Sequence, residues 1–207
     1  MKRRIFLSIL LAATVCIAST VLWAQDSVEE PSTDKLFPAE VSFDHDGVSY
    51  ELAVSGLTVR KKMFFKVYGI AHYMNATGFE NEEAAIEAAL SDEHAKQITM
   101  DFSRCVDAEK IQNAYRDGFK KNASEEEMTE ITDLVDQFVG YFETEVEEDE
   151  IYILRWLPGG IVLTTVTGAE MEPIINTTFA TLLWKIWLGD DSIVDEKKLV
   201  KMAVAEE

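Results

Sequence analysis

Apolar and polar residues alternate along three short stretches of the chain, a pattern that indicates strands with one buried face. The first stretch runs over residues 41–54 and is interrupted by an Asp-Gly dipeptide at 46–47, which favours a tight hairpin turn. The second covers residues 98–102. The third covers residues 150–167, and its Pro-Gly-Gly step at 158–160 again predicts a hairpin. The alternation therefore predicts an antiparallel sheet.

A longer strand-like run covers residues 59–74. If this run is one extended strand, the side chains of Arg60, Phe64, Tyr68 and His72 share one face of the sheet, because alternate residues of a strand point the same way. Arg60 and Tyr68 would then lie about 26 Å apart, given a rise of about 3.3 Å per residue. A single small ligand could contact both only if the strand carried a bulge or if the ligand were long.

Apolar residues recur at helical spacing in other segments of the chain. The expected helices cover residues 81–90, 107–122, 124–142, 177–188 and 192–204. The third of these begins with a capping box, because Ser124 is followed three residues later by Glu127. Strands, helices, strands and again helices, in this order, predict one α+β domain in which helices cover one face of an antiparallel sheet.

Residues 1–24 have the layout of an export signal. Three basic residues at positions 2–4 precede an apolar run over residues 5–23. Because this run is long enough to span a bilayer, an uncleaved membrane anchor is the alternative to a cleaved signal peptide. A cleaved signal predicts a periplasmic or secreted domain, and an anchor predicts a membrane-bound domain that faces the periplasm. Residues 25–40 are expected to be a flexible linker and residues 41–204 to form the domain.

Composition narrows the classes of partner and cofactor. The 207 residues include 38 acidic and 19 basic ones, and the net charge of −19 makes nucleic acid an unexpected partner. The three histidines, His45, His72 and His94, lack metal-ligand spacing, and the chain has no cofactor motif, so neither a metal nor a cofactor is predicted. Outside residues 1–24 the single cysteine is Cys105, which is interpreted as a buried apolar thiol.

Arg60 is the main candidate for ligand contact. A guanidinium that faces the interior is costly to bury alone, so it should meet either a carboxylate of this protein or an anionic ligand. An anionic ligand needs a locally positive site, and Lys62 and Lys66 lie on the same run. Tyr115 and Asn122 lie on the inward stripe of an expected helix and can approach a ligand from the other side.

Several segments together resemble the bacterial, exported branch of the chalcone isomerase-like family. The first is the glycine-to-arginine turn Gly56–Arg60, followed by the Phe-Phe-Lys-Val-Tyr strand at 64–68 and the Tyr-Met pair at 73–74. Residues 108–122 are similar to the family's middle helix, and residues 179–190 to its C-terminal helix. The resemblance implies the chalcone isomerase-like fold, an α+β fold with an antiparallel sheet and helices packed on one face.

The resemblance also implies two kinds of site. In chalcone isomerases an arginine of this strand pair holds a phenolate, while a strand threonine and a helix tyrosine polarise a ketone. Here Arg60 matches the arginine, Tyr68 stands at the threonine position, and Tyr115 and Asn122 keep the spacing of a tyrosine and an asparagine on the helix. Related fatty-acid-binding proteins of this fold hold a carboxylate with an arginine and a tyrosine, below an apolar tunnel, and need no threonine.

The second kind of site fits this sequence better. It implies a non-catalytic protein that binds a small apolar or amphipathic ligand with an anionic end, such as a fatty acid. The ligand-binding residues implied are Arg60, Tyr68, Tyr115 and Asn122. One alternative is an isomerase, an intramolecular lyase that acts on a chalcone-like substrate. The other is a structural or interaction protein without a ligand.

Overall fold

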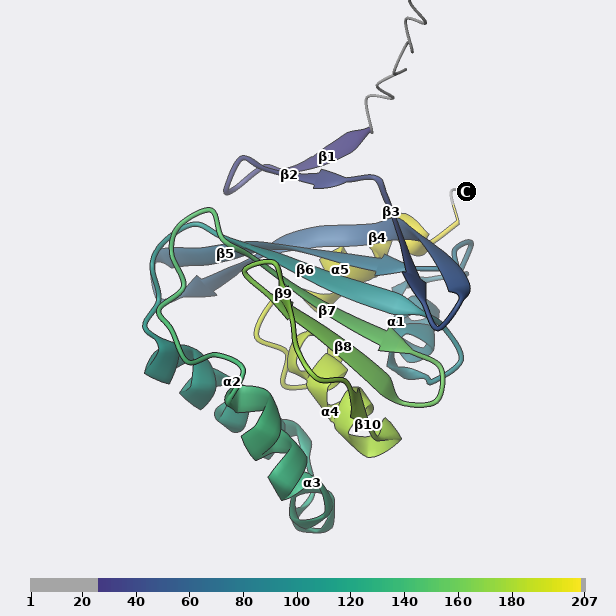
Figure 1. Ribbon diagram of the computed structural model, residues 1–207. Coiled ribbons are helices and arrows are strands. Elements are labelled where there is room, and N and C mark those ends of the chain that lie inside the picture. Colours follow the sequence, from purple (N-terminus) through teal and green to yellow (C-terminus); the bar gives the residue numbers. More distant parts are fainter. Residues whose placement is uncertain (1–25, 206–207) are drawn as a thin grey trace, which may run out of the picture.

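The computed structural model describes residues 26–205 (Figure 1). The leader expected at residues 1–24 lies outside the described residues. Within the described part of the chain, no helix is both long enough and apolar enough to cross a membrane.

A curled antiparallel sheet forms the centre of the domain (Figure 1). Its strand order is β10-β8-β7-β6-β5-β4-β3, and a short strand β9 also pairs with β8. The strands are β3 (Glu40–His45), β4 (Val48–Lys62), β5 (Phe65–Met74), β6 (Lys96–Phe102), β7 (Ile151–Leu157), β8 (Ile161–Val166), β9 (Ala169–Glu170) and β10 (Ile174–Ile175). The hairpins expected at residues 46–47 and 158–160 are confirmed, because these residues connect β3 to β4 and β7 to β8.

The long run over residues 59–74 is not one strand. The chain reverses at Met63, which adopts a left-handed φ of 57°, so β4 and β5 pair as a hairpin. Arg60 and Tyr68 are therefore directly opposite one another on neighbouring strands. They are cross-strand partners, and the expected separation of about 26 Å is wrong.

Helices cover one face of the sheet, as predicted (Figure 1). They are α1 (Glu82–Leu90), α2 (Ala108–Asn122), α3 (Glu125–Val139), α4 (Thr177–Leu188) and α5 (Glu196–Val200), and a 3₁₀ turn follows at Lys201–Ala203. The main core lies between them and the sheet, where residues such as Ile98, Trp156 and Trp184 are fully buried. The capping box is confirmed, since the Ser124 side chain accepts from the Glu127 backbone and the Glu127 side chain accepts from the Ser124 backbone.

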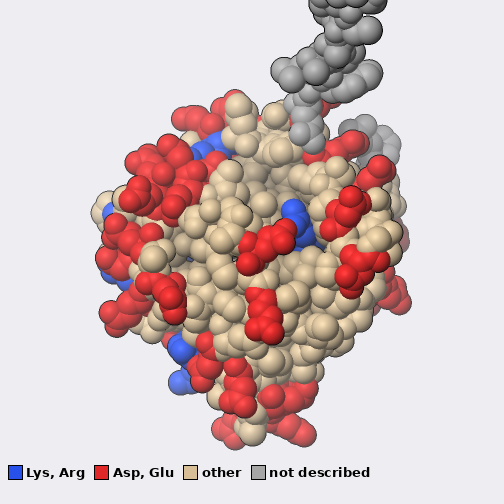
Figure 2. Space-filling view, in the orientation of Figure 1, with Lys and Arg blue, Asp and Glu red and all other residues tan. Residues whose placement is uncertain are grey.

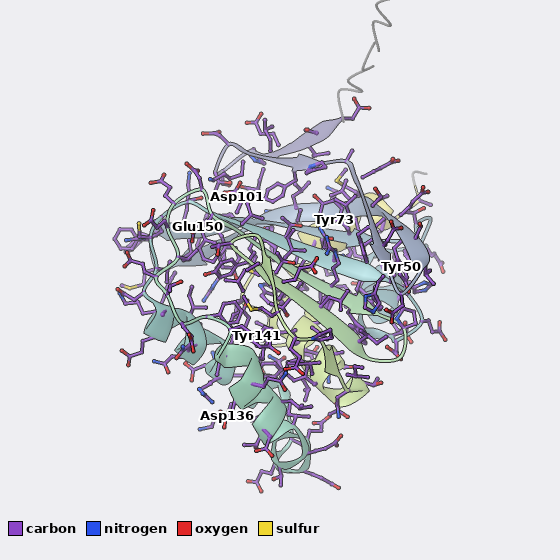
Figure 3. The ribbon with its side chains drawn as sticks, in the orientation of Figure 1. Tyr50, Tyr73, Asp101, Asp136, Tyr141 and Glu150 are labelled. Carbon is purple, nitrogen blue, oxygen red and sulfur yellow. The ribbon has the colours of Figure 1, made fainter. Side chains whose placement is uncertain are left out.

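A small hairpin packs on the opposite face of the sheet. Its strands β1 (Ser27–Glu30) and β2 (Lys35–Pro38) lie in the segment that was expected to be a flexible linker. Phe37 of β2 is buried in a second apolar cluster that includes Tyr73. The Lys35 side chain forms an ion pair with Asp101 at 2.5 Å. Figure 3 shows Tyr73 and Asp101 on the side of the sheet that faces this hairpin. These contacts join residues that are distant in sequence, and they hold the segment in a defined hairpin despite its prolines.

Candidate functional site

A cavity of about 470 Å³ lies between the sheet and helices α2 and α4, beside the β4–β5 hairpin. Its apolar lining comes from both layers: Val67, Met100 and Phe102 from the sheet, and Ile111, Ala114, Tyr115, Ile186 and Trp187 from the helices. The volume is in the range of about 300–1,000 Å³ that is typical of small-molecule pockets. The strands and the two helices therefore leave room for a ligand with an apolar body.

Arg60 lines this cavity from β4 and is half-buried. Its Nη1 donates to two backbone carbonyls, those of Ile193 at 2.7 Å and Lys61 at 2.8 Å. Within residues 26–205 it forms no ion pair with a carboxylate, so the internal salt bridge that was considered for this side chain is not found. Neutral carbonyls orient the guanidinium without cancelling its charge, and Nε and Nη2 remain available to another acceptor.

Tyr68 lies opposite Arg60 on β5 and its side chain also lines the cavity. The Tyr68 hydroxyl accepts a hydrogen bond from Trp187 Nε1 at 3.0 Å. Burial raises the pKa of Tyr68 to about 12, although the Trp187 N–H and the nearby Arg60 charge both act in the opposite direction. The phenol is therefore neutral at physiological pH, and its own O–H can donate to an anion.

Tyr115 enters the cavity from α2. Its ring stacks on Phe142 with centroids 4.9 Å apart and meets the edge of Trp187 at 6.1 Å. Burial raises the pKa of Tyr115 well above its ordinary value, and the neighbouring Tyr68 adds a smaller effect in the same direction. Its hydroxyl has no hydrogen-bond partner among the described residues. The structure thus brings Tyr115 together with Tyr68 and Arg60.

Asn122 does not join this group. It lies at the C-terminal end of α2, and its Nδ2 donates to the backbone carbonyl of Gly118 at 2.9 Å. It is not part of the cavity lining. The spacing that linked Asn122 to Tyr115 in the sequence corresponds to two turns along the helix, which places the two residues at different depths.

The cavity is locally positive in a strongly acidic protein. Besides Arg60, the basic residues in its lining are Lys62, Arg104, Lys110 and Lys121, whereas the acidic residues in the lining are limited to Asp117. Among the charged side chains on the face drawn in Figure 2, acidic ones cover far more of the surface than basic ones. Arg104, Lys110 and Lys121 were missed in the sequence because they come from a loop and a helix far from Arg60, and no motif connects them. An excess of positive charge here favours an anionic ligand.

Cys105 was expected to be a buried thiol, and this is wrong. The residue is exposed, and it belongs to the lining of the cavity. The reason is local: β6 ends at Phe102 and α2 begins at Ala108, so Cys105 lies in the connection between them and not on the inward face of the strand.

His72 lies on the same face of β5 as Tyr68 but is not part of the cavity lining; it is fully buried and contacts Trp184 of α4. Its Nε2 accepts from Trp184 Nε1 at 3.3 Å, so the neutral ring carries its proton on Nδ1, which lies 2.5 Å from Ser55 Oγ. Burial, together with the Lys96 charge, lowers the pKa of His72 to about 3. In residues 26–205 no cluster of three or more histidine, cysteine or acidic residues could hold a metal ion.

Comparisons with known proteins agree with this architecture. A fatty-acid binding protein of Arabidopsis thaliana has a similar structure, with a TM-score of 0.68 and 15% sequence identity over 86% of this chain and 96% of that protein. A search of curated protein sequences finds no match. The model of the chalcone isomerase-like family matches residues 37–201, which cover both layers of the domain and every residue that lines the cavity. The chain therefore belongs to the chalcone isomerase-like family.

Proposed function

We propose that this protein binds a fatty acid or a similar apolar molecule with an anionic end, and that it does so without catalysing a reaction. The observation that carries the proposal is the position of Arg60, a cation without a carboxylate partner in the described chain, at the wall of a cavity whose inner surface is largely apolar and whose charged lining residues are mostly basic. A buried or half-buried guanidinium of this kind is stabilised when an anion reaches it. The structural neighbour that is named as a fatty-acid binding protein supports the same class of ligand.

The geometry assigns a part to each side chain. A ligand carboxylate can accept from the unused nitrogens of Arg60, and it can also accept from the hydroxyl groups of Tyr68 and Tyr115. The alkyl chain would lie against apolar side chains such as Phe102 and Ile111. Burial of the alkyl chain makes binding more favourable in proportion to the apolar area that is removed from water, while the polar residues fix the orientation of the ligand.

Replacing Arg60 by methionine is expected to weaken the binding of oleate by about tenfold to a hundredfold, since a hydrogen bond to a charged group contributes about 1.5–3 kcal/mol. The affinity for oleyl alcohol, which has the same alkyl chain without the charge, should fall much less. Isothermal titration of the full-length protein with both ligands measures this difference.

Arg116→Met is a matched control for this substitution. Arg116 lies on α2 but outside the cavity lining, and it forms an ion pair with Asp136. This variant should bind oleate as the wild type does. The proposal fails if oleate does not bind to the wild type, or if Arg60→Met leaves the affinity for oleate unchanged.

We also propose that the domain functions outside the cytoplasm, because residues 1–24 have the charge and hydropathy pattern of an export signal. The mass of the protein isolated from cells tests this proposal. Cleavage near residue 24 gives a shortened chain in the soluble periplasmic or secreted fraction, whereas an anchor gives the full mass in the membrane fraction. The full mass in the cytoplasmic fraction would contradict export.

A further inference from the structure

The tip of the β4–β5 hairpin exposes a short apolar and basic sequence. Residues 61–66 read Lys-Lys-Met-Phe-Phe-Lys, and all six are exposed. The exposed fractions are 82% for Met63, 94% for Phe64 and 59% for Phe65. Single exposed apolar residues are ordinary, but three consecutive large ones at the tip of a hairpin need a physical reason.

We propose that this tip is a membrane-docking element that inserts Met63 and Phe64 into the interface of a bilayer containing anionic lipids. The turn at Met63 presents the two side chains to solvent at the end of two paired strands. Phe65 lies beneath the guanidinium of Arg104, with 4.8 Å between that group and the ring centroid. The tip is thus an apolar wedge whose side chains are already exposed before it meets a membrane.

The charges next to the wedge fit anionic head groups. Lys61 and Lys62 precede the apolar residues, Lys66 follows them, and Arg104 covers Phe65. A basic residue close to an anionic membrane surface strengthens binding through its attraction to the lipid charge. The protein as a whole is strongly acidic and would be repelled, so the basic hairpin also determines which side approaches the lipid.

The size of the patch favours lipid over a protein partner. A stable protein interface uses about 20–30 residues on each side, whereas the apolar part of this tip has three. In Figure 1 the hairpin lies at the left edge of the view, above the start of α2. Lys62, Met63 and Phe65 also line the cavity, so the cavity lies directly behind the surface that would contact the membrane. The docking itself does not depend on what the cavity binds.

The test places an environment-sensitive fluorophore at the tip of the full-length chain. Phe64→Cys is labelled with nitrobenzoxadiazole in a Cys16→Ser, Cys105→Ser background, because Phe64 is not part of the cavity lining. Ile175→Cys is the matched control, since Ile175 is another exposed apolar residue, at 69%, on strand β10 at the far edge of the sheet. Vesicles consist of phosphatidylcholine, with or without phosphatidylglycerol.

The label at position 64 should brighten and shift to shorter wavelength on vesicles with phosphatidylglycerol, and the label at position 175 should not. Adding Lys61→Gln and Lys62→Gln should remove most of this shift, even if residues 1–24 keep the chain on the membrane. The inference is overturned by an unchanged spectrum at position 64, by equal shifts at both positions, or by a shift that is independent of the two lysines and of phosphatidylglycerol. A shift that requires another protein would also overturn it.

Discussion

Replacing Gly56 by alanine is expected to lower the free energy of unfolding by about 3 kcal/mol or more, at or above the upper end of ordinary overpacking. A Cβ atom at this position would lie 2.0 Å from the Lys198 carbonyl oxygen and 2.6 Å from the Leu199 carbonyl carbon. Both are backbone atoms, so no side-chain rotation can relieve the clash. Helix α5 would have to move away from β4, and the buried bond from Ser55 Oγ to the Leu199 carbonyl, at 2.9 Å, would be lost with it.

Urea unfolding followed by tryptophan fluorescence measures this loss. Gly47→Ala is the control, because Gly47 has a φ of 79° but no atom within 4 Å of the added Cβ. Only conformational strain acts there, and the expected cost is about 1–2 kcal/mol. If Gly56→Ala is no more destabilising than Gly47→Ala, the close approach of α5 is not what selects glycine at position 56.

The same substitution is relevant to the cavity. The segment from Ile193 to Leu199 includes both the carbonyl that orients Arg60 and the backbone that lies on Gly56. A displaced α5 should therefore loosen the hold on Arg60 as well as the core. The sequence suggested that Gly56 makes a turn before Arg60, but it lies within β4, where the absence of a side chain lets a distant helix pack closely.

The sequence predicted those parts of the fold that have a local signal. The Asp-Gly hairpin, the capping box at Ser124 and the helix that ends before Gly189 are each determined by a few neighbouring residues, and each is confirmed. The reversal at Met63 has no such signal, because the chain there contains neither glycine, proline nor asparagine. The hairpin formed by residues 27–38 depends on the burial of Phe37 against the sheet, and no local sequence pattern reveals that contact.

The site followed the same rule. Arg60 and Tyr68 were identified by residue type. The distance between them depends on the turn that joins β4 to β5, which the sequence did not reveal, so the predicted distance was wrong. Tyr115 reaches the cavity because α2 packs against the sheet with its inward stripe, as its periodicity predicted. Asn122 lies on the same helix but does not reach the cavity, because the position of a residue along the helix axis decides this as much as the helix face on which it lies. The basic residues Arg104 and Lys121 meet Arg60 only through the tertiary fold.

Acidification is expected to destabilise the wild type more than a His72→Gln variant. The ordinary histidine pKa of 6.5 is lowered to about 3 in the folded protein, mainly by burial and also by the charge of Lys96. Above pH 6.5 the ring is neutral in both the folded and unfolded states, so this group adds no pH dependence. Between pH 6.5 and about 3 the unfolded state binds a proton that the folded state excludes, and the free energy of unfolding falls by about 1.4 kcal/mol per pH unit.

The difference between the two proteins isolates this effect from the many carboxylates that they share. At pH 7.5 the wild type should be more stable than His72→Gln, because the imidazole forms hydrogen bonds with Trp184 Nε1 and Ser55 Oγ in the core. That advantage should narrow by about 2.3 kcal/mol between pH 6.5 and pH 4.5, since only the wild-type unfolded chain gains the extra proton and the slope reaches its full value only below the unfolded pKa. Urea unfolding of both proteins at several pH values measures the difference. A constant difference across this range would show that His72 is protonated in the fold, contrary to its enclosure by Ser55, Trp184 and the sheet.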